Sequence, residues 1–264
     1  MSLSARLSFA LQLNRLAEAQ ILPRFRKVAV HTKDDGTVVT EADREAERAM
    51  RMLIGERYPD DAILGEEWGV SGPERARHRW ILDPVDGTED FVQRVPTFGT
   101  IIALHYRGEP VVGVIDVPML DARVHAAFGL GAFRGTDRLR LADLDPATPP
   151  TAVRIMTSLR ANFIRHRDDG ALFDAVTRAY PNHRIYRSCY THLCAATGQA
   201  DAAIDASNPI WDIAAARILV EEAGGLFHVA LDYLRGEDRI FTTVFGRPTV
   251  VRHLAALLES AGAR

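Results

Sequence analysis

Trp80-Ile81-Leu82-Asp83-Pro84-Val85-Asp86-Gly87-Thr88 is the stretch around which the rest of the chain is organised. Its first three residues predict a buried strand, and the following residues predict a turn with two carboxylates. Carboxylates held this close repel one another unless a cation lies between them. Mg²⁺ takes oxygen ligands and binds through carboxylates together with substrate phosphate. Gly87 and Thr88 add backbone N–H groups and a hydroxyl at a predicted helix start, which suits a phosphate. The stretch therefore predicts a metal-assisted phosphate site.

Composition narrows the class of protein. The chain has 264 residues, enough for one large domain or two smaller ones. With 47% hydrophobic and 25% charged residues, it has the balance of a globular protein with a sizeable core. The net charge of −3, without a basic block, argues against nucleic acid as a partner. The acidic balance does not exclude phosphate substrates, because a bound metal ion reverses the local electrostatic field.

The cysteines and the N-terminus bear on location. Cys189 and Cys194 form no disulfide framework and no zinc-like set, which fits a reducing cytoplasm. The segment 1–6 lacks the apolar core of a signal peptide, and no stretch is long enough to span a membrane. We therefore expect a cytoplasmic protein that does not enter a membrane.

The N-terminal part predicts two helices. Apolar residues recur at helical spacing over 3–25, and Pro23 ends that helix or follows its end. A second helix begins after Thr40, which has Asp43 three residues further on. On these residues alone, the favoured interpretation of Asp43 is a helix-capping acid.

A short strand over 62–64 precedes Gly65-Glu66-Glu67. Adjacent glutamates are usually solvated, but these follow a buried strand and a glycine and come shortly before the aspartate turn. A ligand role is therefore a second interpretation of Glu66. After the turn, β-branched residues separated by Gly or Pro predict three strands, over 100–106, 110–117 and 123–128.

The second half alternates between strands and helices after a link over 143–150 rich in Pro, Asp and Ala. The predicted strands are 153–156, 183–186, 202–204, 226–231 and 240–245, and the predicted helices are 171–180, 191–197, 209–222 and 250–260. This order predicts an α/β half behind a more antiparallel first half. Asp212, near the start of one helix, is either an acid that complements the helix dipole or a further carboxylate of the metal site.

Together these motifs resemble the inositol monophosphatase superfamily of metal-dependent phosphatases. The resemblance covers nearly the whole chain and rests on Lys33, Thr40–Asp43, Gly65–Glu67, Asp83–Thr88, Trp211–Ala215 and Glu222–Gly225. Haloacid dehalogenase phosphatases also carry an Asp-Gly-Thr motif, but their two aspartates are two residues apart. Asp83 and Asp86 are three apart and enclose a proline, which excludes that family on spacing.

Within the superfamily, Thr37–Asp43, Leu64–Gly69 and Asp90–Val92 are most similar to the bacterial histidinol-phosphate phosphatase branch. Asp205 matches a position where relatives use an acid to contact the alcohol side of the substrate. Arg187-Ser188 departs from the family, because relatives usually carry a glycine followed by a small or acidic residue there. Because of that departure, the resemblance does not determine the alcohol leaving group. It points to a possible second anionic group on the substrate.

The resemblance implies a layered αβαβα sandwich of the inositol monophosphatase/fructose bisphosphatase type, an α/β fold with an α+β first half. It divides the chain into an N-terminal subdomain over 1–145, with most metal ligands, and a C-terminal subdomain over 146–264, with Asp212 and substrate contacts. It also implies a homodimer.

The resemblance further implies roles for single residues. Glu66, Asp83, the Val85 carbonyl, Asp86 and Asp212 would hold about two or three Mg²⁺ ions, for which Mn²⁺ can substitute, with Asp83 as the bridge. Thr88, supported by Asp43, would orient the attacking water, and Glu66 would assist its activation. The substrate would contact Asp86, Gly87, Thr88, Arg187, Asp205 and Asp212.

The leading function is therefore a Mg²⁺-dependent phosphomonoesterase for a small alcohol phosphate. Histidinol phosphate is the first substrate and inositol monophosphate the second. A sugar bisphosphatase or nucleotide 3′-phosphatase of the same superfamily is a further alternative, for which Arg187 is the only support. A non-catalytic binding module on this fold is the alternative outside enzymes, although a scaffold has no physical need for four mutually repelling acids.

Overall fold

The central stretch lies in a large, mostly antiparallel sheet. The computed structural model describes residues 2–27, 29–32, 38–164, 170–236 and 238–262, so Lys33 and Thr37 of the motifs above lie outside the described residues. Strand β5 (His78–Asp86) pairs in parallel with β3 (Ala62–Gly65) and antiparallel with β6 (Gly99–Tyr106). The other strands of this sheet are β4 (Gly69–Ser71), β7 (Glu109–Val117), β8 (Ala122–Ala127), β9 (Gly131–Arg134) and β10 (Asp137–Arg138), in the order β10-β9-β8-β7-β6-β5-β3-β4.

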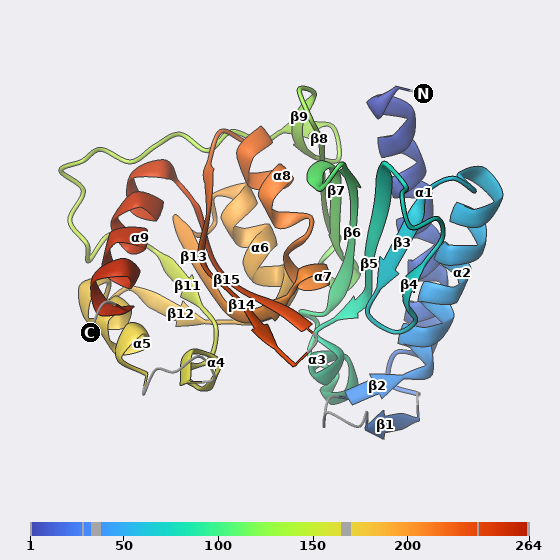
Figure 1. Cartoon of the computed structure of the whole chain (residues 1–264). Coiled ribbons are helices and arrows are strands. Elements are labelled where there is room, and N and C mark those ends of the chain that lie inside the picture. Colours follow the sequence, from blue (N-terminus) through green and yellow to red (C-terminus); the bar gives the residue numbers. More distant parts are fainter. Residues whose placement is uncertain (1, 28, 33–37, 165–169, 237, 263–264) are drawn as a thin grey trace.

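Two helices cover the outer face of this sheet (Figure 1). Helix α1 (Leu3–Ile21) ends two residues before Pro23, and α2 (Glu41–Arg57) begins after Thr40. Their apolar side chains pack on the sheet around Trp80, which is fully buried. Burial of a large apolar side chain stabilises a fold by roughly 1.5–3 kcal/mol. A two-stranded sheet of β1 (Val30–Thr32) and β2 (Val38–Thr40) leads into α2.

The second half forms a mixed five-stranded sheet. Its strands are β11 (Ile155–Thr157), β12 (His183–Ile185), β13 (Ala202–Pro209), β14 (Leu226–Arg235) and β15 (Asp238–Gly246), in the order β12-β11-β13-β15-β14. Strand β11 pairs in parallel with both β12 and β13, whereas β15 pairs antiparallel with both β13 and β14.

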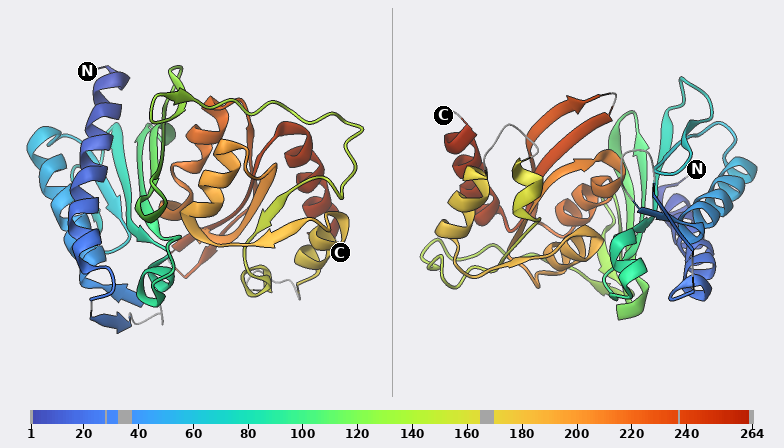
Figure 2. Two further views of the ribbon diagram at one scale, coloured as in Figure 1. Left: turned by 180° about the vertical axis from the view of Figure 1, so that it is seen from behind. Right: turned by 90° about the horizontal axis from the view of Figure 1, so that it is seen from below.

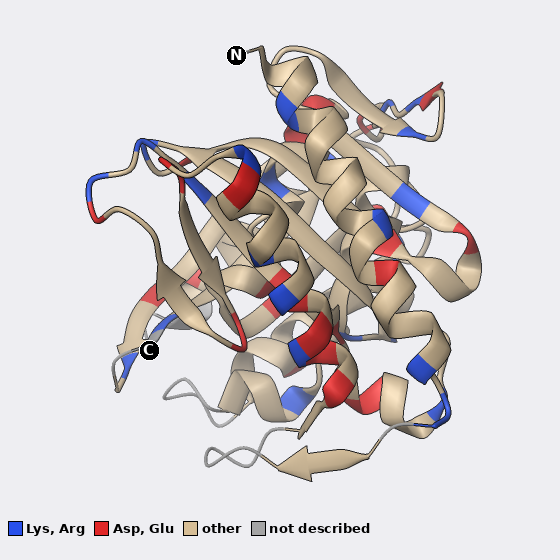
Figure 3. Ribbon diagram, turned by 90° about the vertical axis from the view of Figure 1, so that its right-hand side faces the viewer, with Lys and Arg blue, Asp and Glu red and all other residues tan. Residues whose placement is uncertain are grey.

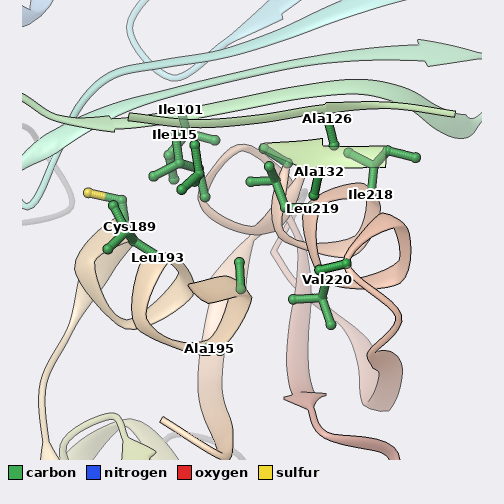
Figure 4. Packing of buried hydrophobic residues seen from close by; sticks show 14 of the residues in the cluster. Ile101, Ile115, Ala126, Ala132, Cys189, Leu193, Ala195, Ile218, Leu219 and Val220 are labelled. Atoms are coloured by element: carbon green, nitrogen blue, oxygen red, sulfur yellow. The ribbon is translucent and has the colours of Figure 1, made fainter. Parts of the chain in front are cut away.

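Helices α6 (Ser188–Thr197), α7 (Ile210–Ile213) and α8 (Ala216–Glu222) lie between the two sheets. Ile101 and Ile115 of the large sheet face Cys189 and Leu193 of α6 in this layer (Figure 4). Helices α4 (Arg160–Ile164), α5 (Ala171–Ala179) and α9 (Pro248–Gly262) pack on the outer face of the second sheet. Figure 2 shows the five layers in succession when the molecule is seen from below. The predicted αβαβα sandwich is confirmed.

The structure differs from the sequence prediction at two places that bear on the site. Asp83–Asp86 is the end of β5 rather than a turn after it, because the pairing with β6 continues through a register shift. The helix predicted over 209–222 is two helices, α7 and α8, with a break between Ile213 and Ala216. The division of the chain at residue 145 stays a prediction.

Acidic and basic residues are mixed along the chain. On the side shown in Figure 3, positions of Lys and Arg are interspersed with those of Asp and Glu. None of the helices over the described ranges is both long enough and apolar enough to cross a membrane.

Candidate active site

A bulge at the end of β5 positions the two aspartates. The register between β5 and β6 shifts between Asp83 and Asp86, and such bulges redirect side chains at the ends of strands. The Thr100 hydroxyl of β6 donates to the Pro84 carbonyl at 2.9 Å, which holds the bulge in place. Gly87 follows with a left-handed backbone (φ 82°) and begins the short helix α3 (Thr88–Gln93). A side chain at Gly87 would meet the Ser188 hydroxyl oxygen at 3.1 Å.

Elements from both halves bring the predicted site residues to one pocket. Its volume is about 370 Å³, and it is framed by the β5 bulge, the start of α3, the start of α6, the end of β13 and α7. Of the predicted residues, the pocket is lined by Glu66, Asp83, Val85, Asp86, Gly87, Thr88, Arg187, Asp205 and Asp212. Asp43 does not line the pocket and acts on it through Thr88.

The acids on the β5 side of the pocket repel one another. Burial, followed by repulsion from Glu66 and Asp86, raises the pKa of Asp83 well above its ordinary range. Burial, followed by repulsion from Asp86 and Glu66, does the same to the pKa of Asp212. Burial also raises the pKa of Asp86 to about 6, although the Cys189 backbone N–H donates to its carboxylate.

This donor set fits a hard divalent cation. The Asp83 Oδ1 atom is buried and has no hydrogen-bond partner among the described residues, and carboxylate and carbonyl oxygens are the ligands Mg²⁺ prefers. Among those residues, no three or more His, Cys, Asp or Glu side chains form a preassembled metal-binding group. The fit therefore rests on the orphaned oxygen, the mutual repulsion of the acids and the oxygen donors of the β5 side.

Asp43 serves the helix and the pocket together. One of its oxygens accepts hydrogen bonds from the Thr40 backbone N–H at 2.8 Å and the Thr40 hydroxyl at 2.6 Å, which completes a capping box. Its other oxygen lies 3.0 Å from the Thr88 hydroxyl, which is also 3.0 Å from the Val85 carbonyl. Burial raises the pKa of Asp43 to about 6, against hydrogen bonds from Thr40 and Thr88 that lower it. The interpretation of Asp43 as a helix-capping acid is confirmed, but it omits the contact with Thr88.

Glu47 holds the turn that carries Glu66, and the sequence analysis missed it. This fully buried carboxylate accepts from the backbone N–H groups of Glu67 at 2.8 Å and Trp68 at 3.2 Å, and from Arg51 at 2.7 Å. A side chain at Gly65 would lie 2.1 Å from Glu47, so only glycine fits there. The signal in the sequence is weak, because Glu47 and Arg51 have the spacing of an ordinary solvated helix pair.

Asp205 has a different environment from the other acids. It is 5% exposed, and its two oxygens lie 2.6 Å from His192 Nε2 and 3.1 Å from the Ser158 hydroxyl. Burial alone would raise its pKa, but the hydrogen bond and charge of His192 outweigh burial and lower it. The sequence analysis named Asp205 but missed both partners, which come from α6 and the loop after β11.

The Arg187-Ser188 departure lies at the mouth of the pocket. The Arg187 guanidinium is 3.2 Å from a Glu89 carboxylate oxygen, and both side chains are substantially exposed. Ser188 has a left-handed backbone (φ 66°), as does Ser207 (φ 62°) across the pocket. Non-glycine residues in this region are strained and cluster at functional sites.

Fold and pocket together define a phosphatase of the layered α/β sandwich class, with an all-oxygen carboxylate site between its halves. The sequence profile of the inositol monophosphatase family matches residues 2–234. The chain belongs to this family, and it is therefore a phosphoric monoester hydrolase.

Individual relatives support this assignment. The chain is 36% identical to a histidinol-phosphatase of Chlorobaculum parvum, over 89% of this chain and 88% of the relative. It is 38% identical to a histidinol-phosphatase of Mycobacterium tuberculosis, over 74% and 75%. Among solved structures, an inositol monophosphatase from Zymomonas mobilis matches with a TM-score of 0.83 and 25% identity, over 98% of this chain and 99% of that one.

Proposed function

We propose that this protein is a Mg²⁺-dependent phosphomonoesterase whose leading substrate is histidinol phosphate. One observation carries the proposal: a pocket in which mutually repelling acids face Asp205, whose pKa is lowered by its hydrogen bond with His192. The first group suits metal and phosphate, and the second suits the ammonium of an amino alcohol. The similarity to two histidinol-phosphatases supports the same substrate.

The metal would be held by the oxygens of the β5 side, namely Glu66, Asp83, the Val85 carbonyl, Asp86 and Asp212. When bound, Mg²⁺ would supply positive charge for the phosphate oxygens and lower the pKa of water. The backbone N–H groups of Gly87 and Thr88 would donate to the phosphate.

Thr88 and Asp43 would orient the attacking water. When the Thr88 hydroxyl donates to Asp43, its lone pairs are free to accept a hydrogen bond from water in the pocket. Asp43, with a pKa of about 6, is suited to accept a proton near neutral pH. Glu66 would assist in activating this water. The water attacks phosphorus and gives its proton through the Thr88 hydroxyl to Asp43, the P–O bond to the alcohol breaks, and the alcohol oxygen takes up a proton from solvent. No side chain is phosphorylated.

A substrate panel tests the proposal. Phosphate release from histidinol phosphate, inositol 1-phosphate and fructose 1,6-bisphosphate is measured with Mg²⁺, with Mn²⁺ and with excess chelator. We expect the highest kcat/KM for histidinol phosphate and loss of turnover in chelator. Full turnover in excess chelator would refute the metal site, and a higher kcat/KM for another ester would refute the substrate.

Inositol 1-phosphate is the second candidate substrate. It is favoured by the likeness to the Zymomonas mobilis protein and by Asp205, which can accept hydrogen bonds from ring hydroxyls. The bisphosphate and nucleotide alternatives still rest on Arg187 alone, which lies 3.2 Å from Glu89 in an exposed pair. A non-catalytic module would give no turnover with any ester of the panel.

Assembly, location and domain division belong to the same proposal. We expect a cytoplasmic homodimer that acts on small phosphate esters, with 1–145 carrying most of the metal ligands and 146–264 the alcohol contacts. Light scattering on the purified protein checks the dimer.

A further inference from the structure

His192 is a buried residue that the proposed reaction does not use. It lies on α6, is 1% exposed, and packs edge-on against Phe245 with ring centres 5.2 Å apart. Its Nε2 atom is 2.6 Å from Asp205 Oδ2. Its Nδ1 atom is buried without a hydrogen-bond partner among the described residues. The only hydrogen bond recorded for this ring in the described structure therefore goes to Asp205.

The direction of this hydrogen bond follows from Asp205. The lowered pKa keeps the Asp205 carboxyl ionised at neutral pH, and an ionised carboxylate only accepts. His192 Nε2 must therefore carry the hydrogen. The Ser158 hydroxyl lies 3.1 Å from the other Asp205 oxygen, and the Ala206 N–H donates to Ser158 at 2.8 Å. Two neighbours from different elements thus fix the plane of the carboxylate.

We infer that His192 is a positioning residue that sets substrate choice by holding the Asp205 carboxylate in place against the cationic part of an amino-alcohol phosphate. The inference rests on the proposed function. Each carboxylate oxygen has two lone pairs, so Asp205 keeps acceptor capacity toward the pocket that it lines. A carboxylate already oriented loses less conformational freedom when it binds an ammonium group.

A competing interpretation is that His192 only fills the space between α6 and the second sheet. The two interpretations differ in what a variant changes. A space-filling residue affects turnover of all esters alike, whereas a positioning residue affects esters that need Asp205. The informative quantity is therefore the ratio of kcat/KM for histidinol phosphate to kcat/KM for glycerol 2-phosphate, which carries no ammonium group.

Four variants test the inference in the Mg²⁺-loaded protein. His192→Leu removes the donor at similar volume, and we expect the ratio to fall roughly tenfold, mainly through KM for histidinol phosphate. His192→Gln places an amide N–H at similar reach and should keep the ratio within about twofold. Ser158→Ala should lower the ratio by about threefold. In an Asp205→Asn background, His192→Leu should change the ratio no further. Melting temperatures are measured alongside, and His192→Asn, too short to reach Asp205, replaces His192→Leu if that variant does not fold.

The possible failures are distinguishable. If the wild type hydrolyses neither ester, the proposed function fails and the inference fails with it. If the wild type hydrolyses both esters but the His192 variants lower both equally, the proposed function stands and the inference is overturned. The inference would also be overturned if His192→Leu lowered the kcat/KM ratio in the Asp205→Asn background as much as it does in the wild type. His192 would then act through another group.

Discussion

The two sides of the pocket hold buried aspartates in opposite electrostatic states. On the β5 side, burial and neighbouring acids raise the pKa values of Asp83, Asp86 and Asp212. On the β13 side, the hydrogen bond and charge of His192 help to lower the pKa of Asp205 although it is buried. Repulsion between acids dominates on the first side, and a hydrogen-bonded histidine dominates on the second.

This difference teaches how one pocket can bind two unlike groups. A buried acid stays charged only with a compensating partner. On the β13 side the chain supplies that partner, so Asp205 is ready before any ligand arrives. On the β5 side the acids repel one another, and the proposed Mg²⁺ would compensate that repulsion when it binds.

The largest expected effect separates the two sides by an identical substitution. Asp83→Asn should lower kcat by more than the roughly 10⁴-fold that a general base contributes, because several predicted ligand contacts depend on Asp83. In excess chelator the same variant should be as stable as the wild type or more stable, because one repelling charge is gone. Urea unfolding measures the stability, and phosphate release measures kcat.

Asp205→Asn is the matched control. It weakens a charge-assisted hydrogen bond from His192, so we expect a loss of about 1–3 kcal/mol in the free energy of unfolding. Equal changes in stability for the two variants would contradict the comparison between the two sides.

Asp43 provides the second prediction, because it combines a raised pKa with a full set of hydrogen bonds. Asp43→Asn should lower kcat by on the order of 10²-fold, less than Asp83→Asn. In the wild type, kcat should fall as the pH drops through about 6, because a protonated Asp43 accepts less well from Thr88. The pH profile of kcat for both proteins checks this limb.

The free energy of unfolding should change with pH in the opposite direction to kcat. The folded pKa of Asp43, about 6, lies above the ordinary value of 3.8. The folded state therefore binds the proton more tightly, and this stabilisation is present below pH 4 and lost as the pH rises through 6. The shift corresponds to roughly 3 kcal/mol. The free energy of unfolding is measured for wild type and Asp43→Asn at pH 4.5 and 7.5. The difference between the two proteins should be smaller at pH 7.5 than at pH 4.5. A difference that grows with pH would refute the raised pKa.

The β5 side was predictable from the sequence because its signals are local. A proline between two acids, a glycine in a left-handed conformation and a capping box each leave a mark in a few consecutive residues. Those marks place Asp43, Asp83, Gly87 and Thr88, and their catalytic roles stay predictions. The layered fold was predictable for a similar reason, since strand and helix periodicities are local patterns.

The β13 side was not predictable because its contacts are made by packing. His192 and Asp205 lie on α6 and β13, and no short pattern relates them. Glu47 and Gly65 are likewise distant in sequence, and only the structure shows that the carboxylate occupies the space a side chain at Gly65 would need. The break between α7 and α8 was missed because Ala214 and Ala215 are good helix formers.

Glu47 gives the third prediction, since it is an acid with an internal partner on the metal side of the pocket. Glu47→Gln keeps the shape but weakens the hold on the Glu67 and Trp68 N–H groups, so the turn carrying Glu66 loosens. We expect an approximately 10–100-fold higher Mg²⁺ concentration for half-maximal activity. Glu45→Gln is the matched control, because Glu45 lies on the same helix, is partly exposed and pairs with Arg48 rather than with the turn. An unchanged Mg²⁺ requirement would show that the turn is held without Glu47.

Arg187 gives the smallest expected effect and tests whether this arginine takes part in substrate choice. It slightly lowers the pKa of Asp212, but burial and the neighbouring acids outweigh it. Its partner is Glu89, and exposed pairs of this kind contribute about 0–1 kcal/mol. Arg187→Gly should therefore change kcat/KM for histidinol phosphate by less than about fivefold. If Arg187 instead reads a second phosphate, the variant loses activity selectively toward fructose 1,6-bisphosphate. Such a selective loss, in a wild type that prefers the bisphosphate, would mean that Arg187 leaves Glu89 and binds the second phosphate of the substrate.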